Sequence, residues 1–316
     1  MKEPSFKFLQ PPKCDVSIVV VNFNTRQTLL NCLQSIYTHT QDISFETIVV
    51  DNDSVDGSAD AVAEQFPQIQ LIRNFSNPGL SVGYNQGIRK SRGRYVVLLN
   101  SDTLLIENCF LKLTRYLDKN PEFHIASPQI VDESGKPFSM RLWQDTPMDA
   151  FWRILGKYNI AGEQDRMGKI EPKEVEALGG SCFVVRRALF EIIGLYDENF
   201  FLYNEEDDFC RRARQAGKKV CYYPETSIHH LLGKSTHLPE HREKVILETY
   251  KSYLHFYSKY YSLPWNIFLR FVYCCTFVLG MGTSLLKYVF KRNSMAVDDR
   301  LSFKLKLLFM RVPFRS

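Results

Sequence analysis

The sequence predicts an α/β fold in which helices cover a doubly wound, mostly parallel sheet. Three runs of apolar, largely β-branched residues, at 16–21, 46–50 and 95–99, predict strands that are buried on both faces. Segments with helical signals separate these runs, and strands that alternate with helices are joined by right-handed parallel crossovers. The 316 residues are enough for one large core or two smaller ones.

The first elements are a lead-in over residues 1–13, the strand at 16–21 and a helix that Asn24 or Thr25 can cap. The segment 130–178 has no regular periodicity, and we interpret it as an insertion over the site. The other expected elements are, in chain order, the strand 46–50, a helix through Val62, the strand 69–73, a helix over 81–89, the strand 95–99, a helix over 107–119, a strand at 182–185, a helix that ends at Gly217, and a strand at 219–223.

Polar side chains follow three of the predicted strands. Asn22 and Asp51 end the first two, and Asn100 and Asp102 follow the strand at 95–99. A single strand that ends in polar residues is explained by an ordinary turn. The carboxyl ends of parallel strands, however, meet at one edge of a sheet, where ligands bind. A carboxylate such as Asp102 on a rigid strand end suits a divalent cation that faces a diphosphate. Together these residues predict a polar crevice for a ligand.

Two common nucleotide-binding motifs are absent. A dinucleotide site requires a G-x-G-x-x-G turn after the first strand, and here that turn, residues 22–25, contains no glycine. The chain also has no G-x-x-x-x-G-K-[ST] sequence. Side chains, rather than a glycine cradle, must therefore hold any nucleotide.

A second unusual stretch places four carboxylates in the first turn of an expected helix, after the aromatic residues of 200–203: Glu205, Glu206, Asp207 and Asp208. The helix dipole favours one or two acidic residues at this position. Four repel one another and raise the proton affinity of one member, which suits a general base. Further on, His229 and His230 follow the strand at 219–223, and for them both a ligand role and an ordinary structural role stay open.

In this combination and order, the sequence resembles the family 2 glycosyltransferases and, among them, the rhamnosyltransferase-like members. The resemblance covers about residues 16–236, and no single piece carries it alone. The segments that carry it are 19–24 (VVVNFN), 50–58 (VDNDSVDGS), 77–87 (NPGLSVGYNQG), 99–102 (LNSD), 203–208 (YNEEDD) with Arg212, and His230 ahead of Gly233 and Ser235.

The resemblance implies a GT-A fold over residues 14–238, which binds a nucleotide diphospho-sugar. It implies a Mg²⁺ or Mn²⁺ ion held by Asp102 with His230 as a second ligand, and it implies Glu206, paired with Glu205, as the base. Asp208 is grouped with these catalytic residues, and Glu205 or Asp207 could replace Glu206. The implied nucleotide-sugar contacts are Asn22, Asn24, Asp51 (which would accept from the imide N–H of the base), Asp53, Ser54, Asn85, Asn100 and Ser101.

The implied reaction is inverting transfer of a sugar from dTDP-rhamnose or a UDP-sugar to a hydroxyl of a glycan or a polyprenyl-linked saccharide, in cell-surface polysaccharide synthesis. The alternative is a non-catalytic nucleotide-sugar-binding or scaffolding protein on the same fold. Asn100 favours this alternative, because it stands where the family's metal motif begins with a carboxylate and an amide oxygen binds Mg²⁺ or Mn²⁺ more weakly. The donor, the acceptor and a possible homo-oligomer are not determined.

Residues 239–316 are expected to form a helical extension. A helix over 240–261 is rich in aromatic residues, the apolar run 271–286 is shorter than the roughly 20 residues that span a bilayer, and 301–309 mixes lysine with large apolar residues, as interfacial helices do. With the basic residues after Ser284, this predicts peripheral association with the inner face of the cell membrane, ahead of a packed helical subdomain or an oligomer contact.

The cysteine content and the net charge indicate which compartment and which partners to expect. The eight cysteines contain no CxxC pair, which indicates neither a zinc site nor a disulfide framework and favours the reducing cytoplasm. No nucleic-acid-binding module is recognisable behind the net charge of +5, so we expect no nucleic-acid partner.

Overall fold

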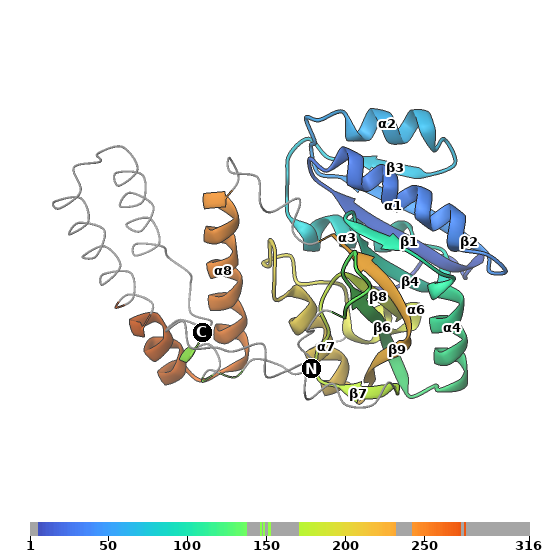
Figure 1. Ribbon diagram of the computed structural model, residues 1–316. Coiled ribbons are helices and arrows are strands. Elements are labelled where there is room, and N and C mark those ends of the chain that lie inside the picture. Colours follow the sequence, from blue (N-terminus) through green and yellow to red (C-terminus); the bar gives the residue numbers. More distant parts are fainter. Residues whose placement is uncertain are drawn as a thin grey trace. The chain divides into compact units, whose positions relative to one another are not determined.

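The computed structural model describes residues 6–137, 146, 148, 151–152, 171–231, 242–272 and 275. The chain divides into two compact units (Figure 1). One contains Met1–Gln144 and Ile160–Pro239, and the other contains Asp145–Asn159 and Glu240–Ser316. Most of the expected insertion at 130–178, and the apolar and basic segments after 275, lie outside the described residues.

The first unit is built on one sheet, in which the described residues form nine strands in the order β3-β2-β1-β4-β8-β6-β9-β5, with β7 also paired to β9. The strands are β1 (Cys14–Asn22), β2 (Phe45–Asp51), β3 (Gln70–Arg73), β4 (Gly93–Asn100), β5 (Thr103–Leu105), β6 (Phe123–Val131), β7 (Lys173–Val175), β8 (Cys182–Arg186) and β9 (Lys219–His230). The pairs β1–β2, β1–β4, β2–β3 and β6–β9 are parallel. Strand β8 runs antiparallel to both β4 and β6, so β6 points the same way as β4.

Helices connect and cover these strands: α1 (Arg26–His39), α2 (Ser58–Gln65), α3 (Leu80–Lys90), α4 (Cys109–Lys119), α6 (Arg187–Ile193) and α7 (Glu205–Gln215). Helix α3 packs on β1 and β2, while α4 packs on β6 and β9. The packing of α3 is close, because a Cβ at Gly83 would lie 2.8 Å from Val21 Cγ1. A small residue at this position therefore lets the helix approach the strand that ends in the predicted site.

The expected α/β fold with a mostly parallel sheet is confirmed, and each expected strand is present. The strands β5, β6 and β7 and the helix α6 were not expected. Strand β9 also extends beyond the expected 219–223, so His229 and His230 do not follow the strand but form its end. The sheet is mixed because β8, the neighbour of β4, runs in the opposite direction.

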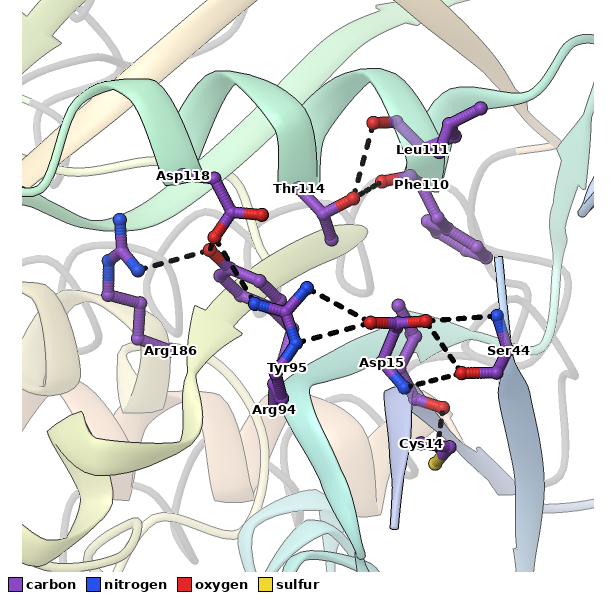
Figure 2. Close-up of polar contacts among 11 residues, drawn as sticks. Cys14, Asp15, Ser44, Arg94, Tyr95, Phe110, Leu111, Thr114, Asp118 and Arg186 are labelled. Atoms are coloured by element: carbon purple, nitrogen blue, oxygen red, sulfur yellow. Dashed lines mark hydrogen bonds and ion pairs between the residues drawn. The ribbon is translucent and has the colours of Figure 1, made fainter. Parts of the chain in front are cut away.

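The amino end of β4 is fixed by a network of matched charges (Figure 2). The Tyr95 hydroxyl donates to Asp118 Oδ1 at 2.6 Å and accepts from Arg186 Nη1 at 3.0 Å. Arg94 Nη2 donates to Asp15 Oδ1 at 3.0 Å, and Arg94 Nη1 reaches Asp118 Oδ1 at 3.3 Å. Tyr95 is buried, so this network ties β4 firmly to β1, α4 and β8.

The second unit contains α8 (Arg242–Tyr260), which lies within the expected helix over 240–261, and a further helical segment at 263–272. Phe256, Tyr257 and Leu269 are fully buried, whereas Ile267 and Phe271 are exposed. Among the described residues, no helix is both long and apolar enough to cross a bilayer.

Candidate active site

The strand ends that were expected to share one edge of the sheet do so. Asn22 is in register with Asp51 on β2, and Val21 is in register with Asn100 on β4. Asn22 Nδ2 donates to Asp51 Oδ2 at 2.8 Å, and the backbone N–H of Ser54 donates to the other oxygen of Asp51 at 2.9 Å. Both Asn22 and Asp51 are nearly inaccessible to solvent, so this pair forms the rigid floor of the edge.

The loops above this floor are joined to it by further hydrogen bonds. Ser54 Oγ accepts from Asn22 Nδ2 at 3.0 Å and from the backbone N–H of Asn24 at 2.9 Å. Asn24 and Asp53 both have left-handed backbones, with φ of 53° and 65°, and Asp53 is exposed. The expected nucleotide residues Asn22, Asn24, Asp51 and Ser54 thus lie in one network, with Asp53 at its exposed margin.

Thr25 connects this network to the turn after β4. Its hydroxyl donates to Asn22 Oδ1 at 2.6 Å and lies 3.0 Å from Ser101 Oγ. The sequence suggested Thr25 only as a helix cap, and although it does occupy that position, its side chain makes no capping hydrogen bond. The expected nucleotide and metal residues are therefore parts of one continuous edge.

Asp102 and His230 come together, although 128 positions separate them along the chain. His230 Nε2 lies 3.1 Å from Asp102 Oδ1, with side-chain exposures of 12% and 6%. Strand β5 pairs with β9 so that Thr103 faces His230, and the backbone N–H of Leu231 donates to Asp102 O at 2.9 Å. Backbone pairing on both sides therefore fixes this contact.

A bulge in β9 sets the position of His230. Pro128 pairs with Tyr223 but the next residue, Gln129, pairs with Ser227, so the residues between Tyr223 and Ser227 have no partner on β6. Glu107 Oε1 holds the bulge, since it accepts from Thr226 Oγ1 at 2.6 Å and from the backbone N–H of Ser227 at 2.9 Å.

The Asp102–His230 pair fits a divalent cation that is shared with a phosphate ligand. A carboxylate oxygen and an imidazole nitrogen already face each other, and Mg²⁺ or Mn²⁺ sites often take one or two protein ligands and complete their shell from substrate phosphates. Within the described ranges, no group of three or more His, Cys, Asp or Glu residues could hold a metal alone. The pair therefore requires ligand oxygens to complete a coordination shell.

The acidic run forms the first turn of α7. Three of the four carboxylates are buried, while Glu206 is half-exposed and lies beside Gly180, where a Cβ would be 3.6 Å from Glu206 Cδ. Tyr203 and Asn204, just before the helix, both have φ of 66°, a left-handed conformation that is unfavourable for tyrosine. Two consecutive residues of this kind indicate a strained entry that the surrounding structure maintains.

The carboxyl group of Glu205 favours its protonated form. Burial raises the pKa of Glu205 well above its usual range, and the charge of Glu206 and a hydrogen bond between the two carboxyl groups act in the same direction. Glu205 Oε2 is buried and has no hydrogen-bond partner in the described structure. Glu206 is thus the partly exposed residue of the pair, although its Oε2 atom is buried, and it lies beside a buried carboxyl group that favours its protonated form.

Asp208 has a different place from the one expected. It is fully buried, and Arg212 Nε donates to its Oδ2 at 2.7 Å. The Arg212 guanidinium also donates to the carbonyls of Ile193 and Leu195, at 2.7 and 2.9 Å. Because Asp208 has no surface that could meet a substrate, we assign it the support of α7 in place of a catalytic role.

Asn85 is likewise occupied by protein groups. Its Nδ2 donates to Tyr196 O and to Glu198 Oε1, both at 2.9 Å, and its Oδ1 accepts from the backbone N–H of Tyr196 at 2.9 Å. Leu80 N–H donates to Phe201 O at 2.7 Å. Helix α3 therefore holds the segment that leads into the acidic turn, and this side chain, fully buried, positions that segment in place of the expected direct contact with a ligand.

Tyr84 contacts the turn after β4 and is influenced by the charges of the acidic turn. Its hydroxyl donates to Asn100 Oδ1 at 3.1 Å. Burial raises the pKa of Tyr84 well above its usual value, and the charges of Glu205, Asp102 and Glu206 raise it further, so all three carboxylates lie within electrostatic reach of this phenol. Periodicity alone could not have found Tyr84, because it occupies an ordinary buried position of α3.

A direct backbone contact links the two halves of the site. Asn100 N–H donates to Ser181 O at 3.0 Å, and a Cβ on the preceding residue, Gly180, would lie 3.6 Å from Glu206 Cδ. The turn after β4, which carries Asp102, and the first turn of α7 are thus neighbours across the start of β8.

The sequence profile described as Glycosyl transferase family 2 matches residues 17–194, more than half of the chain. This chain belongs to glycosyl transferase family 2. The expected glycosyltransferase is therefore confirmed at the level of the family, and the matched region includes every predicted nucleotide-binding residue and Asp102.

Two curated relatives of this family 2 chain show how far the similarity extends. A low-salt glycan biosynthesis hexosyltransferase of Haloferax volcanii is 29% identical over 209 residues, which cover 64% of this chain and 62% of that protein. An N-acetylglucosaminyl-diphospho-decaprenol L-rhamnosyltransferase of Mycobacterium tuberculosis is 26% identical over 223 residues, 63% of this chain and 73% of that protein. The chain thus spans less than two thirds of the first of these relatives.

Solved structures show the same fold as this family 2 chain. GalNAc-T7, solved with UDP, GalNAc and Mn²⁺, aligns with a TM-score of 0.54 at 20% identity, over 78% of this chain and 50% of that one. A mannosyltransferase from Pyrobaculum calidifontis, solved with GDP-Man and Mn²⁺, aligns with a TM-score of 0.53 at 16% identity, over 96% and 91%. The alignments confirm the GT-A fold.

Proposed function

We propose that this chain is an inverting glycosyltransferase that moves a sugar from a nucleotide diphospho-sugar to a hydroxyl group of a glycan or lipid-linked saccharide. The observation that supports it best is that Asp102, which contacts His230, lies with Glu205 and Glu206 within electrostatic reach of Tyr84, at the carboxyl edge of the sheet. The two curated relatives, named as a hexosyltransferase and a rhamnosyltransferase, support the same reaction class.

In this proposal, the donor lies along the edge from β2 to β5. Asp51 and Asp53, with Asn24 and Ser54, face the nucleoside, while the fully buried Asn22 supports Asp51 from below in place of the expected direct contact. The turn of Asn100, Ser101 and Asp102 faces the diphosphate. Asp102 and His230 hold a Mg²⁺ or Mn²⁺ ion, for which the Mn²⁺ in both solved neighbours is the supporting precedent. When bound, the ion offsets the negative charge that develops on the leaving diphosphate.

Glu206 acts as the base. It accepts the proton of the acceptor hydroxyl while that oxygen bonds to the anomeric carbon and the bond to the diphosphate oxygen breaks, with inversion at the carbon. Glu206 suits this role because it is the one partly exposed residue among the four of the acidic turn, and burial raises the pKa of its neighbour Glu205, which favours the protonated form of that group. The α3 contacts through Asn85 and Leu80 hold the acidic turn in place.

The acceptor and the location are proposed at a coarser level. A dTDP-rhamnose or UDP-sugar donor and a polyprenyl-linked acceptor follow from the likeness to the rhamnosyltransferase. Peripheral binding to the inner face of the cell membrane is consistent with the exposed Ile267 and Phe271 and with the basic residues after Ser284. Flotation with vesicles that contain anionic lipid tests this part, and a protein that stays at the bottom of the gradient contradicts it.

Donor binding and turnover together test the proposed function. The purified chain is screened against UDP-, dTDP- and GDP-sugars with Mg²⁺, Mn²⁺ or EDTA, first by thermal shift and then by release of the nucleoside diphosphate. We expect one nucleotide series to bind more tightly with metal and to be hydrolysed slowly even without an acceptor. Binding with no turnover of any donor indicates the non-catalytic alternative, and the absence of binding contradicts both.

A further inference from the structure

The amide of Asn100 has one polar end in use and one end available. Its Oδ1 accepts from the Tyr84 hydroxyl, and no acceptor for its Nδ2 occurs among the described residues. The Asn100 side chain is half-exposed, at the edge of the sheet between the nucleotide network and the acidic turn. An amide whose oxygen faces a phenol must direct its two N–H groups elsewhere.

Tyr84 maintains this orientation. Only 3% of the residue is exposed, and its ring packs against that of Tyr196 with 5.9 Å between the centroids. If the amide turned over, its nitrogen would face the phenol, and the buried hydroxyl proton would lose its acceptor.

We infer that Tyr84 is a positioning residue that turns Asn100 so that its N–H groups, and not its oxygen, contact an oxygen of the sugar-nucleotide donor. That oxygen belongs either to a phosphate or to a ribose hydroxyl, since both accept from an amide N–H. The inference rests on the proposed function. It makes Asn100 a ligand-binding residue that needs no metal, and it leaves the cation to Asp102 and His230.

The surrounding charge explains why such a donor is useful. Asp102, Glu205 and Glu206 all lie near the same edge, and without a cation they repel a diphosphate. A neutral N–H group in the first position of the turn attracts the ligand without adding a carboxylate. The affinity for the nucleotide should therefore have one contribution that depends on Asn100 and a separate contribution that depends on the metal and Asp102.

Calorimetric binding of a nucleoside diphosphate in EDTA tests the inference, using UDP or dTDP, whichever the wild type binds. Asn100→Ala should weaken metal-free binding about three- to tenfold, the range for one neutral hydrogen bond. Tyr84→Phe should weaken it by a similar or smaller factor. The double variant should bind no more weakly than Asn100→Ala, because Tyr84 acts only through Asn100.

The same titrations identify the oxygen that Asn100 contacts. If the loss also occurs with the free nucleoside, the contact is a ribose hydroxyl. If it requires the phosphates, the contact is a phosphate oxygen. Either result supports the inference.

The matched control is Tyr95→Phe, which removes another buried phenol from the opposite end of β4. It should leave nucleotide binding unchanged, and circular dichroism should show that each variant is folded. Asn100→Asp is a second variant, which should weaken metal-free binding because it replaces the amide N–H groups with a negative charge.

Three results overturn the inference. The first is a loss in Asn100→Ala that occurs only when Mn²⁺ is present, and the second is an additive loss in the double variant. The third is an Asn100→Asp protein that binds Mn²⁺ more tightly with metal-free binding intact, which would make residue 100 a metal ligand through its oxygen. A wild type that binds no nucleotide contradicts the proposed function itself, so the two failures are distinguishable.

Discussion

The two ends of β4 differ in the charged side chains that surround them. At the amino end, Arg94 faces Asp15 and Asp118, and the buried Tyr95 hydroxyl both donates and accepts (Figure 2). At the carboxyl end, the carboxylates of Asp102, Glu205 and Glu206 all lie within electrostatic reach of Tyr84, and burial together with the charge of Glu206 raises the pKa of Glu205. The amino end pairs opposite charges, whereas at the carboxyl end several carboxylates act on the same phenol.

This difference separates groups that stabilise the fold from groups that are held for a ligand. Burying like charges and an acceptor with no hydrogen-bond partner, such as Glu205 Oε2, lowers stability, and a protein keeps such an arrangement where a ligand or a proton uses it. The left-handed backbones of Tyr203 and Asn204 add to this cost at the same end. We therefore expect substitutions at the two ends to affect different measurements.

The largest effect is expected for Glu206→Gln. Loss of a general base slows transfer by about 10²- to 10⁴-fold, whereas the binding of the nucleoside diphosphate should change little because Glu206 faces the acceptor. Product formation at saturating donor measures the first quantity, and calorimetry measures the second. A variant that transfers sugar at near the wild-type rate would show that another group is the base.

The next effect concerns metal-dependent binding. Asp102→Ala should weaken the binding of the nucleoside diphosphate in Mn²⁺ by about 10- to 100-fold, but binding in EDTA should change much less. Asp118→Ala, an aspartate at the amino end of β4, is the matched control and should leave both affinities unchanged. Equal losses for Asp102→Ala with and without metal would contradict the assignment of the ion to this residue.

A smaller effect, on stability, is expected for Glu205→Gln. Because the pKa of Glu205 is raised in the folded protein, the folded state keeps a proton that the unfolded chain releases above its ordinary value near 4.5. Wild-type stability should therefore fall as the pH rises toward the folded-state pKa, with a slope of up to about 1.4 kcal/mol per pH unit from this group.

Glutamine cannot release a proton, so the variant should show a shallower loss and melt at a higher temperature than the wild type at alkaline pH. Denaturant unfolding between pH 5 and 9 measures the difference. Parallel pH profiles for the two proteins would show that Glu205 is already ionised in the folded state.

The smallest effect is expected at the amino end. Tyr95→Phe removes one buried hydroxyl from the Asp118–Arg186 network and should lower the free energy of unfolding by about 1 kcal/mol, with no change in nucleotide binding. Chemical denaturation and calorimetry give the two values. A clear loss of nucleotide affinity in this variant would mean that the two ends of the strand are coupled.

The parts of the fold that could be predicted are those whose signals are local. Strands β1, β2 and β4 are unbroken apolar runs that end in polar residues, so both the strands and the shared edge follow from the sequence. Strand β6 contains His124, Ser127 and Pro128, which interrupt any periodic pattern, and it was not found. Pro224 similarly concealed the second half of β9.

The site residues also differ in whether a local sequence signal predicts their contacts. The resemblance named Asp102 and His230 together, and the structure places them in contact, whereas the contacts of Asn85 and Tyr84 join distant segments that no local pattern of the sequence records. The position of Asp208 could have been inferred, because Arg212 follows it by four residues, the spacing of an ion pair along a helix.

The bulge in β9 decides which of two adjacent imidazoles meets Asp102. Neighbouring side chains of a strand point to opposite faces, so His229 and His230 cannot both face the same carboxylate. Deleting one residue between Tyr223 and Ser227 would shift the alternation by a single step and exchange the two histidines. The number of residues in the bulge that Glu107 holds thus decides which imidazole faces Asp102, and a change in chain length there would exchange the two without altering Asp102 or either histidine.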